Sequence, residues 1–78
     1  MSSETVTFAD IAEGDTIEIL GTKVVVTRLK MVDASWVDIV DPNRARLRIY
    51  YTTVADGRQL FYTVPVPARM AAVVRYLP

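Results

Sequence analysis

The sequence has 78 residues, enough for one small domain covering residues 1–78, and it contains neither cysteine nor histidine. Disulfides, thiolate and imidazole metal sites and the commonest general base are therefore excluded, and we expect neither a cofactor nor an enzyme. Nine basic and nine acidic residues cancel, so the chain as a whole attracts polyanions only weakly.

The two halves of the chain differ in charge. Residues 1–43 carry eight acidic and three basic side chains, whereas residues 44–78 carry one acidic and six basic side chains. We interpret this asymmetry as acidic and basic strands that pair inside one domain. The alternatives are head-to-tail self-association, which would make a homo-oligomer, and a basic face for an anionic partner.

The sequence shows no sign of membrane insertion or export. No apolar run approaches the roughly 20 residues that span a bilayer. The opening Met-Ser-Ser-Glu lacks the basic start and apolar stretch of a signal peptide. We therefore expect a cytoplasmic protein with no membrane partner, folded throughout except for residues 1–4.

Turn residues divide the chain into short runs rich in β-branched side chains, a pattern typical of a small β-domain. Residues 5–8 are expected to be extended, and residues 9–13 to form a helical turn. Strands are predicted at 15–20 and 23–31, and a further strand at 36–40. The fold class we expect is an all-β, antiparallel barrel of five or six strands.

Three turn signals set the expected register. A two-residue turn at Gly21-Thr22 predicts these pairs: Ile19 with Val24, Ile17 with Val26, and Asp15 with Arg28. A turn at Asp41-Pro42-Asn43, within a loop at 41–45, predicts two more: Ile39 with Leu47, and Val37 with Ile49. The Asp56-Gly57 turn predicts the last set: Leu47 with Val66, Ile49 with Val64, Tyr51 with Tyr62, and Thr53 with Leu60.

Pro65 and Pro67 lie in or after the last long strand, and because proline cannot donate to a ladder, this strand should lie at a sheet edge or be about to leave the sheet. Residues 68–71 are expected to form a turn of helix. Two adjacent valines favour a closing strand at 73–77 over a helix. The predicted core is Ile17, Ile19, Val24, Val26, Val37, Ile39, Leu47, Ile49, Tyr51, Leu60, Tyr62, Val64 and Val66.

The same register determines the opposite face of the sheet. It pairs Trp36 with Tyr50, Asp38 with Arg48, Val40 with Arg46, and Thr52 with Phe61. The candidate partner-binding residues are therefore Trp36, Arg46, Arg48, Tyr50 and Phe61. Such a patch suits base stacking with phosphate contact, or an interaction hot spot for a protein. The structural alternative is a set of cross-strand pairs covered by the chain's own termini, with the arginines solvated.

The acidic residues Asp10, Glu13 and Asp15 lie close together before the first long strand. Their spacing lacks the full ligand loop of a calcium site, so we expect a solvated acidic loop and no metal.

The run Gly14-Asp15-Thr16-Ile17, the turn at Gly21 and the helical turn before the last strand resemble an SH3-like small barrel. The segment Val64-Pro65-Val66-Pro67, followed by Val73-Val74-Arg75, resembles the ending of small uncharacterised actinobacteriophage proteins. Barrels of this kind bind nucleic acid, peptides or their own copies, so the resemblance implies a fold and does not choose a function.

Neutral net charge decides between the two functions that this patch suits. Nucleic-acid binding draws much of its affinity from phosphate neutralisation. We therefore expect a non-enzymatic protein-interaction or assembly module, such as a phage accessory protein. The alternative is a nucleic-acid-binding barrel.

Overall fold

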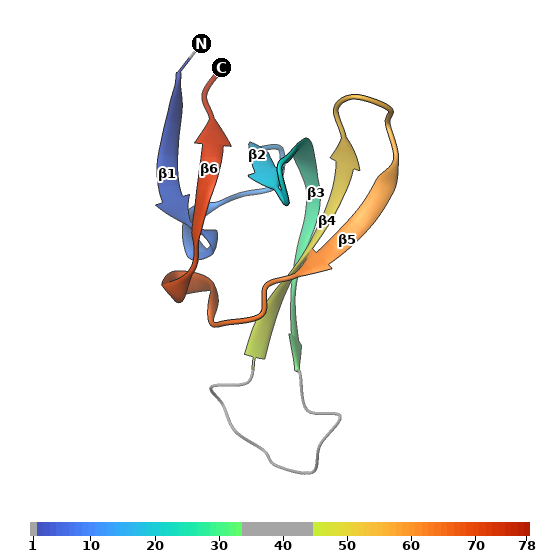
Figure 1. Cartoon of the computed structure of the whole chain (residues 1–78). Helices are drawn as coiled ribbons and strands as arrows, with labels where there is room; N and C mark the ends of the chain where they lie inside the picture. The colour runs from blue at the N-terminus through green and yellow to red at the C-terminus, as the bar shows by residue number, and fades with distance from the viewer. Residues whose placement is uncertain (1, 34–44) are drawn as a thin grey trace.

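The computed structural model describes residues 2–33 and 45–78. In this part of the chain, six antiparallel strands form one sheet in the order β1-β6-β2-β3-β4-β5 (Figure 1). The elements are β1 (Ser3–Thr7), the 3₁₀ turn η1 (Phe8–Asp10), β2 (Thr16–Ile19), β3 (Thr22–Asp33), β4 (Ala45–Thr53), β5 (Gln59–Thr63), the 3₁₀ turn η3 (Ala68–Met70) and β6 (Ala72–Tyr76). The all-β class is confirmed. The sheet has two edges, β1 and β5, so the closed barrel that we expected is not shown.

The β2–β3 hairpin turns at Leu20 and Gly21, whose φ angles of 51° and 78° are both positive, as a tight two-residue hairpin turn requires. Ile19 therefore pairs with Thr22, and Ile17 pairs with Val24. The turn therefore lies one residue before the predicted Gly21-Thr22, and the predicted register is wrong by two residues. Because side chains alternate with a period of two, this shift leaves the same residues facing inward.

The first hairpin also corrects the predicted pair of Asp15 with Arg28. The Val26 amide donates to the Asp15 carbonyl at 2.9 Å, so Asp15 lies opposite Val26. The Asp15 side chain contacts Arg75 of β6 instead. An acidic residue of the first half therefore does pair with a basic residue of the second half, but through a different strand.

The β4–β5 hairpin has a longer loop than the two-residue turn that Asp56-Gly57 predicts. The Thr53 amide donates to the Arg58 carbonyl at 2.9 Å, which leaves residues 54–57 in the loop. The Thr53 hydroxyl accepts from the Arg58 amide at 2.9 Å and donates to Asp56. These side-chain bonds stabilise the wider loop.

The wider loop shifts the predicted β4–β5 register by two residues. Ile49 pairs with Tyr62, Tyr50 with Phe61, and Tyr51 with Leu60. The same residues of β4 still face inward, because a shift of two residues does not change the face on which a side chain lies.

Strand β4 pairs with β3 on one side and with β5 on the other. Leu47 lies opposite Met31, and Ile49 lies opposite Leu29. The predicted pairs of Leu47 with Ile39 and of Ile49 with Val37 are therefore wrong, because β3 is 12 residues long and fills those positions. The predicted strand at 36–40 and the predicted turn at 41–43 lie outside the described residues.

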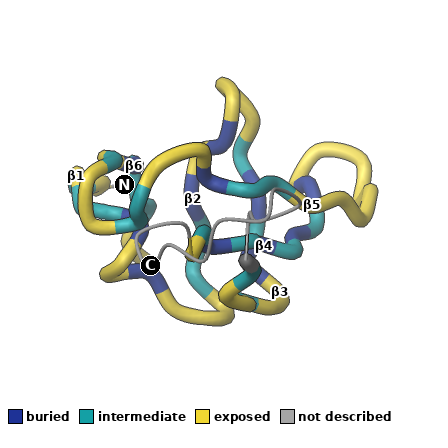
Figure 2. Tube along the Cα trace, turned by 90° about the horizontal axis from the view of Figure 1, so that it is seen from below, coloured by how far each residue is buried: buried dark blue, intermediate teal, exposed yellow. Residues whose placement is uncertain are grey.

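The core lies on the inner face of the sheet, where buried positions alternate with half-buried or exposed ones along β2 and β4 (Figure 2). Its buried apolar residues are Phe8, Ile11, Ile17, Ile19, Val24, Val26, Leu47, Ile49, Tyr51, Val64 and Val73. Tyr62 is half-buried and packs against this cluster. Leu60 and Val66, predicted as core, are 40% and 38% exposed, because β5 is an edge strand and the chain leaves the sheet after it.

The chain termini are more ordered than we expected. Ser3 and Glu4 belong to β1 and pair with Tyr76 and Arg75, so the prediction that residues 1–4 stay unfolded is wrong for these two. The two ends of the chain lie side by side (Figure 1). Pairing with β6 orders the start of the chain.

The predictions for the C-terminal part are confirmed. The strand before Pro65 is at a sheet edge, a helical turn forms at Ala68–Met70, and Ala72–Tyr76 is a strand. The predicted helical turn at 9–13 is shorter and begins earlier, at Phe8–Asp10. No helix within residues 2–33 or 45–78 has the length and apolar character needed to cross a membrane.

Candidate functional site

The outer face of β3, β4 and β5 carries a group of basic and aromatic side chains. We call it the cationic–aromatic face, and it consists of Arg28, Lys30, Arg46, Arg48, Tyr50 and Phe61. On β4 it follows from alternation, because Leu47, Ile49 and Tyr51 are buried and their neighbours must point to the other side.

A bulge in β3 brings Arg28 to this face. Val26 pairs with Tyr51 and Arg28 pairs with Tyr50, so Thr27 is an extra residue in the strand. The Thr27 hydroxyl donates to the Tyr50 carbonyl at 3.0 Å, which holds the bulge in place. Beyond it, Lys30 follows Arg28 on the outer face.

The two aromatic rings of the face are neighbours. Tyr50 and Phe61 lie directly opposite each other, with ring centroids 6.1 Å apart. The predicted partner of Phe61, Thr52, instead lies opposite Gln59. Phe61 is 59% exposed, so much of its ring is available to a partner. The third predicted aromatic residue, Trp36, lies outside the described residues.

Cations lie against both rings. The Arg48 guanidinium carbon is 4.9 Å from the Phe61 ring centroid, and that of Arg28 is 5.7 Å from the Tyr50 centroid. These are cation–π distances. The Arg48 Nε also donates to the Thr63 hydroxyl at 3.2 Å, which limits the freedom of its side chain.

Two like charges face each other across the ladder, since Lys30 pairs directly with Arg48. The predicted neighbours of the arginines were different: Lys30, not Asp38, lies opposite Arg48, and Val32, not Val40, lies opposite Arg46. Arg46 donates through Nε to the Pro65 carbonyl at 3.3 Å. Both ion pairs of the described residues belong to Arg75, so no described carboxylate pairs with Lys30 or Arg48.

The positive potential of this face acts on Tyr50. A hydrogen bond from Arg48 lowers the pKa of the Tyr50 phenol below its usual value, against a smaller opposing effect of desolvation. The positive charges of Arg48, Lys30 and Arg28 lower the same pKa further, because they favour the phenolate.

A hollow of about 350 Å³ lies at the edge of the face, and its lining includes Arg28, Tyr50, Gln59 and Phe61. Aromatic faces stack on planar groups, a guanidinium binds anions, and a carboxamide both donates and accepts hydrogen bonds. A larger hollow of about 420 Å³, between η1, η3 and the far end of β3 and β4, has an almost wholly apolar lining and offers no such combination.

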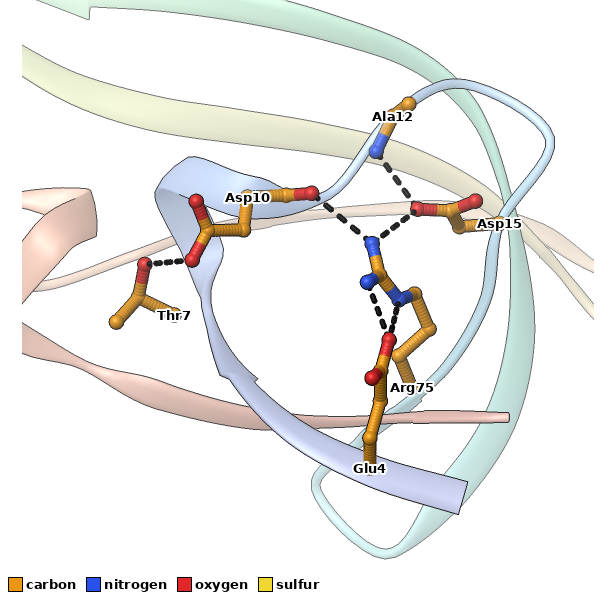
Figure 3. A network of polar contacts seen from close by, with 6 residues as sticks. All are labelled: Glu4, Thr7, Asp10, Ala12, Asp15 and Arg75. Atoms are coloured by element: carbon orange, nitrogen blue, oxygen red, sulfur yellow. Dashed lines mark hydrogen bonds and ion pairs between the residues drawn. The ribbon is translucent and has the colours of Figure 1, made fainter. Parts of the chain in front are cut away.

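Arg75 forms the contrasting cationic site of the molecule (Figure 3). Its Nε and Nη2 both donate to Glu4 Oε1, the former at 2.8 Å. Its Nη1 donates to the Asp10 carbonyl at 3.0 Å and lies 3.4 Å from Asp15 Oδ2. The hydrogen bond to Glu4, with smaller electrostatic contributions from Glu4 and Asp15, raises the pKa of Arg75 against desolvation.

Asp10 and Glu13 of the acidic loop are exposed and Asp15 is half-buried, and all three carboxylates accept hydrogen bonds. Asp15 Oδ2 also accepts from the Ala12 amide at 2.8 Å, Glu13 accepts from the Leu29 amide at 3.2 Å, and Asp10 accepts from the Thr7 hydroxyl at 3.1 Å. Each carboxylate therefore holds the backbone or a neighbouring strand. Residues 2–33 and 45–78 contain no group of three acidic side chains placed to hold a metal ion.

The structure brings together four of the five predicted site residues: Arg46, Arg48, Tyr50 and Phe61. The sequence reasoning missed Arg28, Lys30 and Gln59. Arg28 and Lys30 were overlooked because the β3 bulge leaves no mark in the alternation and because the strand beside β4 was assigned to residues 36–40. Comparison with family models, curated proteins and solved structures finds no match, so the function rests on the chemistry of this face.

Proposed function

We propose that this chain binds single-stranded nucleic acid, without catalysis, on the cationic–aromatic face. The observation that carries the proposal is the direct opposition of Lys30 and Arg48, beside the neighbouring rings of Tyr50 and Phe61. Like charges directly opposite each other destabilise a sheet, so the opposition of these two cations works against folding, although Arg48 also contacts Thr63 and Phe61 on β5. A phosphate group between the two cations would relieve their repulsion.

The aromatic residues support a single strand as the ligand. Bases of a single strand are free to stack on exposed rings, and such stacking tolerates any base because every base has a π-face. Phe61 is exposed, and it lines the same hollow as Gln59 and Arg28. A double helix would offer its phosphates but would keep its bases stacked inside.

The zero net charge of the chain does not oppose this function. Glu4 and Asp15 neutralise Arg75, and Glu13 binds the Leu29 amide. These three acidic side chains stabilise the fold, and they lie on other elements than the cationic–aromatic face. The local excess of positive charge, and not the sum over the chain, attracts phosphates. The order of the two functions expected from the sequence is therefore reversed.

A protein partner remains the second candidate, as a protein-interaction or assembly role. Arginine and aromatic side chains are enriched in interaction hot spots, and Arg48 stacked on Phe61 is such a combination. This candidate retains Trp36 as an anchor. An SH3-like barrel and a phage accessory role are part of this second candidate, and only the resemblance of the sequence supports them.

The test is fluorescence anisotropy with labelled single-stranded DNA, single-stranded RNA and duplex DNA at low and moderate salt. We expect preference for a single strand, with log K falling against log salt by about 0.7 for each phosphate contact. Arg48→Gln should reduce this slope, and Phe61→Ala should weaken binding about fivefold or more through lost stacking.

The matched control is Arg69→Gln, which removes the same charge from an exposed position on η3. It should leave binding close to that of the unaltered chain. Equal losses for Arg69→Gln and Arg48→Gln, or no binding at low salt, would contradict the proposal. Capture of a protein that survives salt and is lost in Phe61→Ala would instead support the second candidate.

A further inference from the structure

Strand β5 is an edge strand whose outer side has free backbone groups. The Thr53 amide donates to the Arg58 carbonyl, and the Val64 amide donates to the Leu47 carbonyl. Hydrogen-bonded pairs alternate along an antiparallel ladder, so residues 58, 60, 62 and 64 point their backbone groups toward β4. Gln59, Phe61 and Thr63 point theirs away, and within the described chain no strand pairs with them.

This edge lacks the features that keep strands from pairing with other chains. Exposed edge strands are usually protected by lysine, by a bulge or by prolines within the strand. Residues 59–67 contain no charged side chain, and no register shift interrupts the β4–β5 ladder. Pro65, which has no N–H, follows β5 and limits the pairing segment to the strand itself.

We propose that two copies of this chain pair through β5, antiparallel and about a two-fold axis at Phe61. Phe61 would then exchange backbone hydrogen bonds with the partner's Phe61, and Gln59 with the partner's Thr63. This register is self-complementary, brings no two charged residues opposite each other, and leaves Pro65 beyond the paired segment. The exposed part of Leu60 would be covered by the second copy.

The other edge of the sheet is less suited to this role. The Phe8 amide donates to the Ala71 carbonyl, and the Leu77 amide donates to the Ser2 carbonyl. By the same alternation, β1 points the backbone groups of Ser3, Thr5 and Thr7 outward. These are small polar side chains, so pairing there would bury little apolar surface. A β1–β5 contact would moreover be head-to-tail and form open chains, whereas β5–β5 pairing closes at a dimer.

Pairing through β5 would join two cationic–aromatic faces, because the sheet continues across the two-fold axis with Phe61 on the same side in both copies. The pairing itself does not depend on the proposed function and is tested without nucleic acid. If both hold, a dimer would bind a longer single strand than one copy does.

The experiment is sedimentation equilibrium of the full chain over a range of concentrations. We expect a monomer–dimer equilibrium. Total synthesis allows an N-methyl group on the outward amide of Phe61, with the side chain unchanged. It should raise the dimer Kd about tenfold or more, because each copy loses one intermolecular hydrogen bond. N-methylation of Thr5, the matched position on β1, should leave the Kd unchanged.

Amide hydrogen exchange locates the interface without any modification. The amides of Gln59, Phe61 and Thr63 should exchange more slowly as protein concentration rises, whereas those of Ser3, Thr5 and Thr7 should not change. A monomer at every concentration would overturn the proposal. So would a dimer that tolerates N-methyl-Phe61, a dimer weakened by N-methyl-Thr5, or concentration-dependent protection that appears on β1 alone.

Discussion

The same sheet uses basic residues in two opposite ways. Arg75 on β6 is only 25% exposed in its side chain and contacts two carboxylates and a carbonyl. Lys30 and Arg48 on β3 and β4 face each other instead and have no ion pair within the described chain. The first arrangement closes the end of the core near the chain termini. In the second, two like charges oppose each other and no described carboxylate pairs with either, which is why we regard it as a binding site.

The largest expected effect separates the two faces of β4 itself. Ile49 is fully buried, so Ile49→Ala should reduce the free energy of unfolding by about 2–5 kcal/mol through lost burial and a cavity. Arg48→Gln, one position earlier on the outer face, should reduce it far less, because it removes only the hydrogen bond to Thr63 and the contact with Phe61. Urea unfolding followed by far-ultraviolet circular dichroism measures both. Comparable losses would mean that Arg48 is structural and would remove the contrast.

Removing the paired cation should have the next largest effect. Arg75→Gln leaves Glu4 and Asp15 without their guanidinium partner and separates β1 from the loop before β2, so the midpoint of thermal unfolding should fall. Arg75→Lys keeps the positive charge but loses the several donors of the guanidinium. Its midpoint should therefore lie between those of Arg75→Gln and the unaltered chain. Oligonucleotide binding per folded molecule should stay the same. A variant that binds more weakly while fully folded would contradict the structural role.

Removing Lys30, which has no ion pair within the described part of the chain, should have the opposite effect on stability. Lys30→Gln relieves the repulsion with Arg48, so the free energy of unfolding should rise by about 0.2–1 kcal/mol at low salt. The gain should shrink as salt screens the charges. Oligonucleotide binding should weaken in the same variant. A stability loss that persists at high salt would show that Lys30 supports the fold.

The smallest effect concerns the potential at the face. Arg48→Gln removes the main cause of the lowered pKa of Tyr50, so this pKa should rise toward the usual value of 10.0. Titration of the Tyr50 ring resonances by NMR gives the value directly. Arg69→Gln, distant along the chain on η3, is the control and should leave it unchanged. An unaltered Tyr50 pKa in Arg48→Gln would mean that the two side chains do not interact in solution.

Much of β4 could be predicted from the sequence, because alternation is a local property. Leu47, Ile49 and Tyr51 were placed inward, and Arg46, Arg48 and Tyr50 outward, and the structure agrees. These assignments survived a wrong register at both hairpins, since each error was an even number of residues. The edge position of the strand before Pro65 could likewise be predicted, because proline lacks a donor wherever it lies.

The sequence by itself determined the all-β class, the inward and outward residues of β4, and the closing strand at Ala72–Tyr76, all of which follow from short-range alternation and turn chemistry. Only the tertiary structure decided the neighbours. The β3 bulge at Thr27, the loop closed by Thr53 and Asp56, and the contact between Glu4 and Arg75 across the length of the chain depend on side chains and strands meeting in space. The pattern of hydrophobic and polar residues does not predict such contacts, because the free energy that favours them comes from groups distant in sequence.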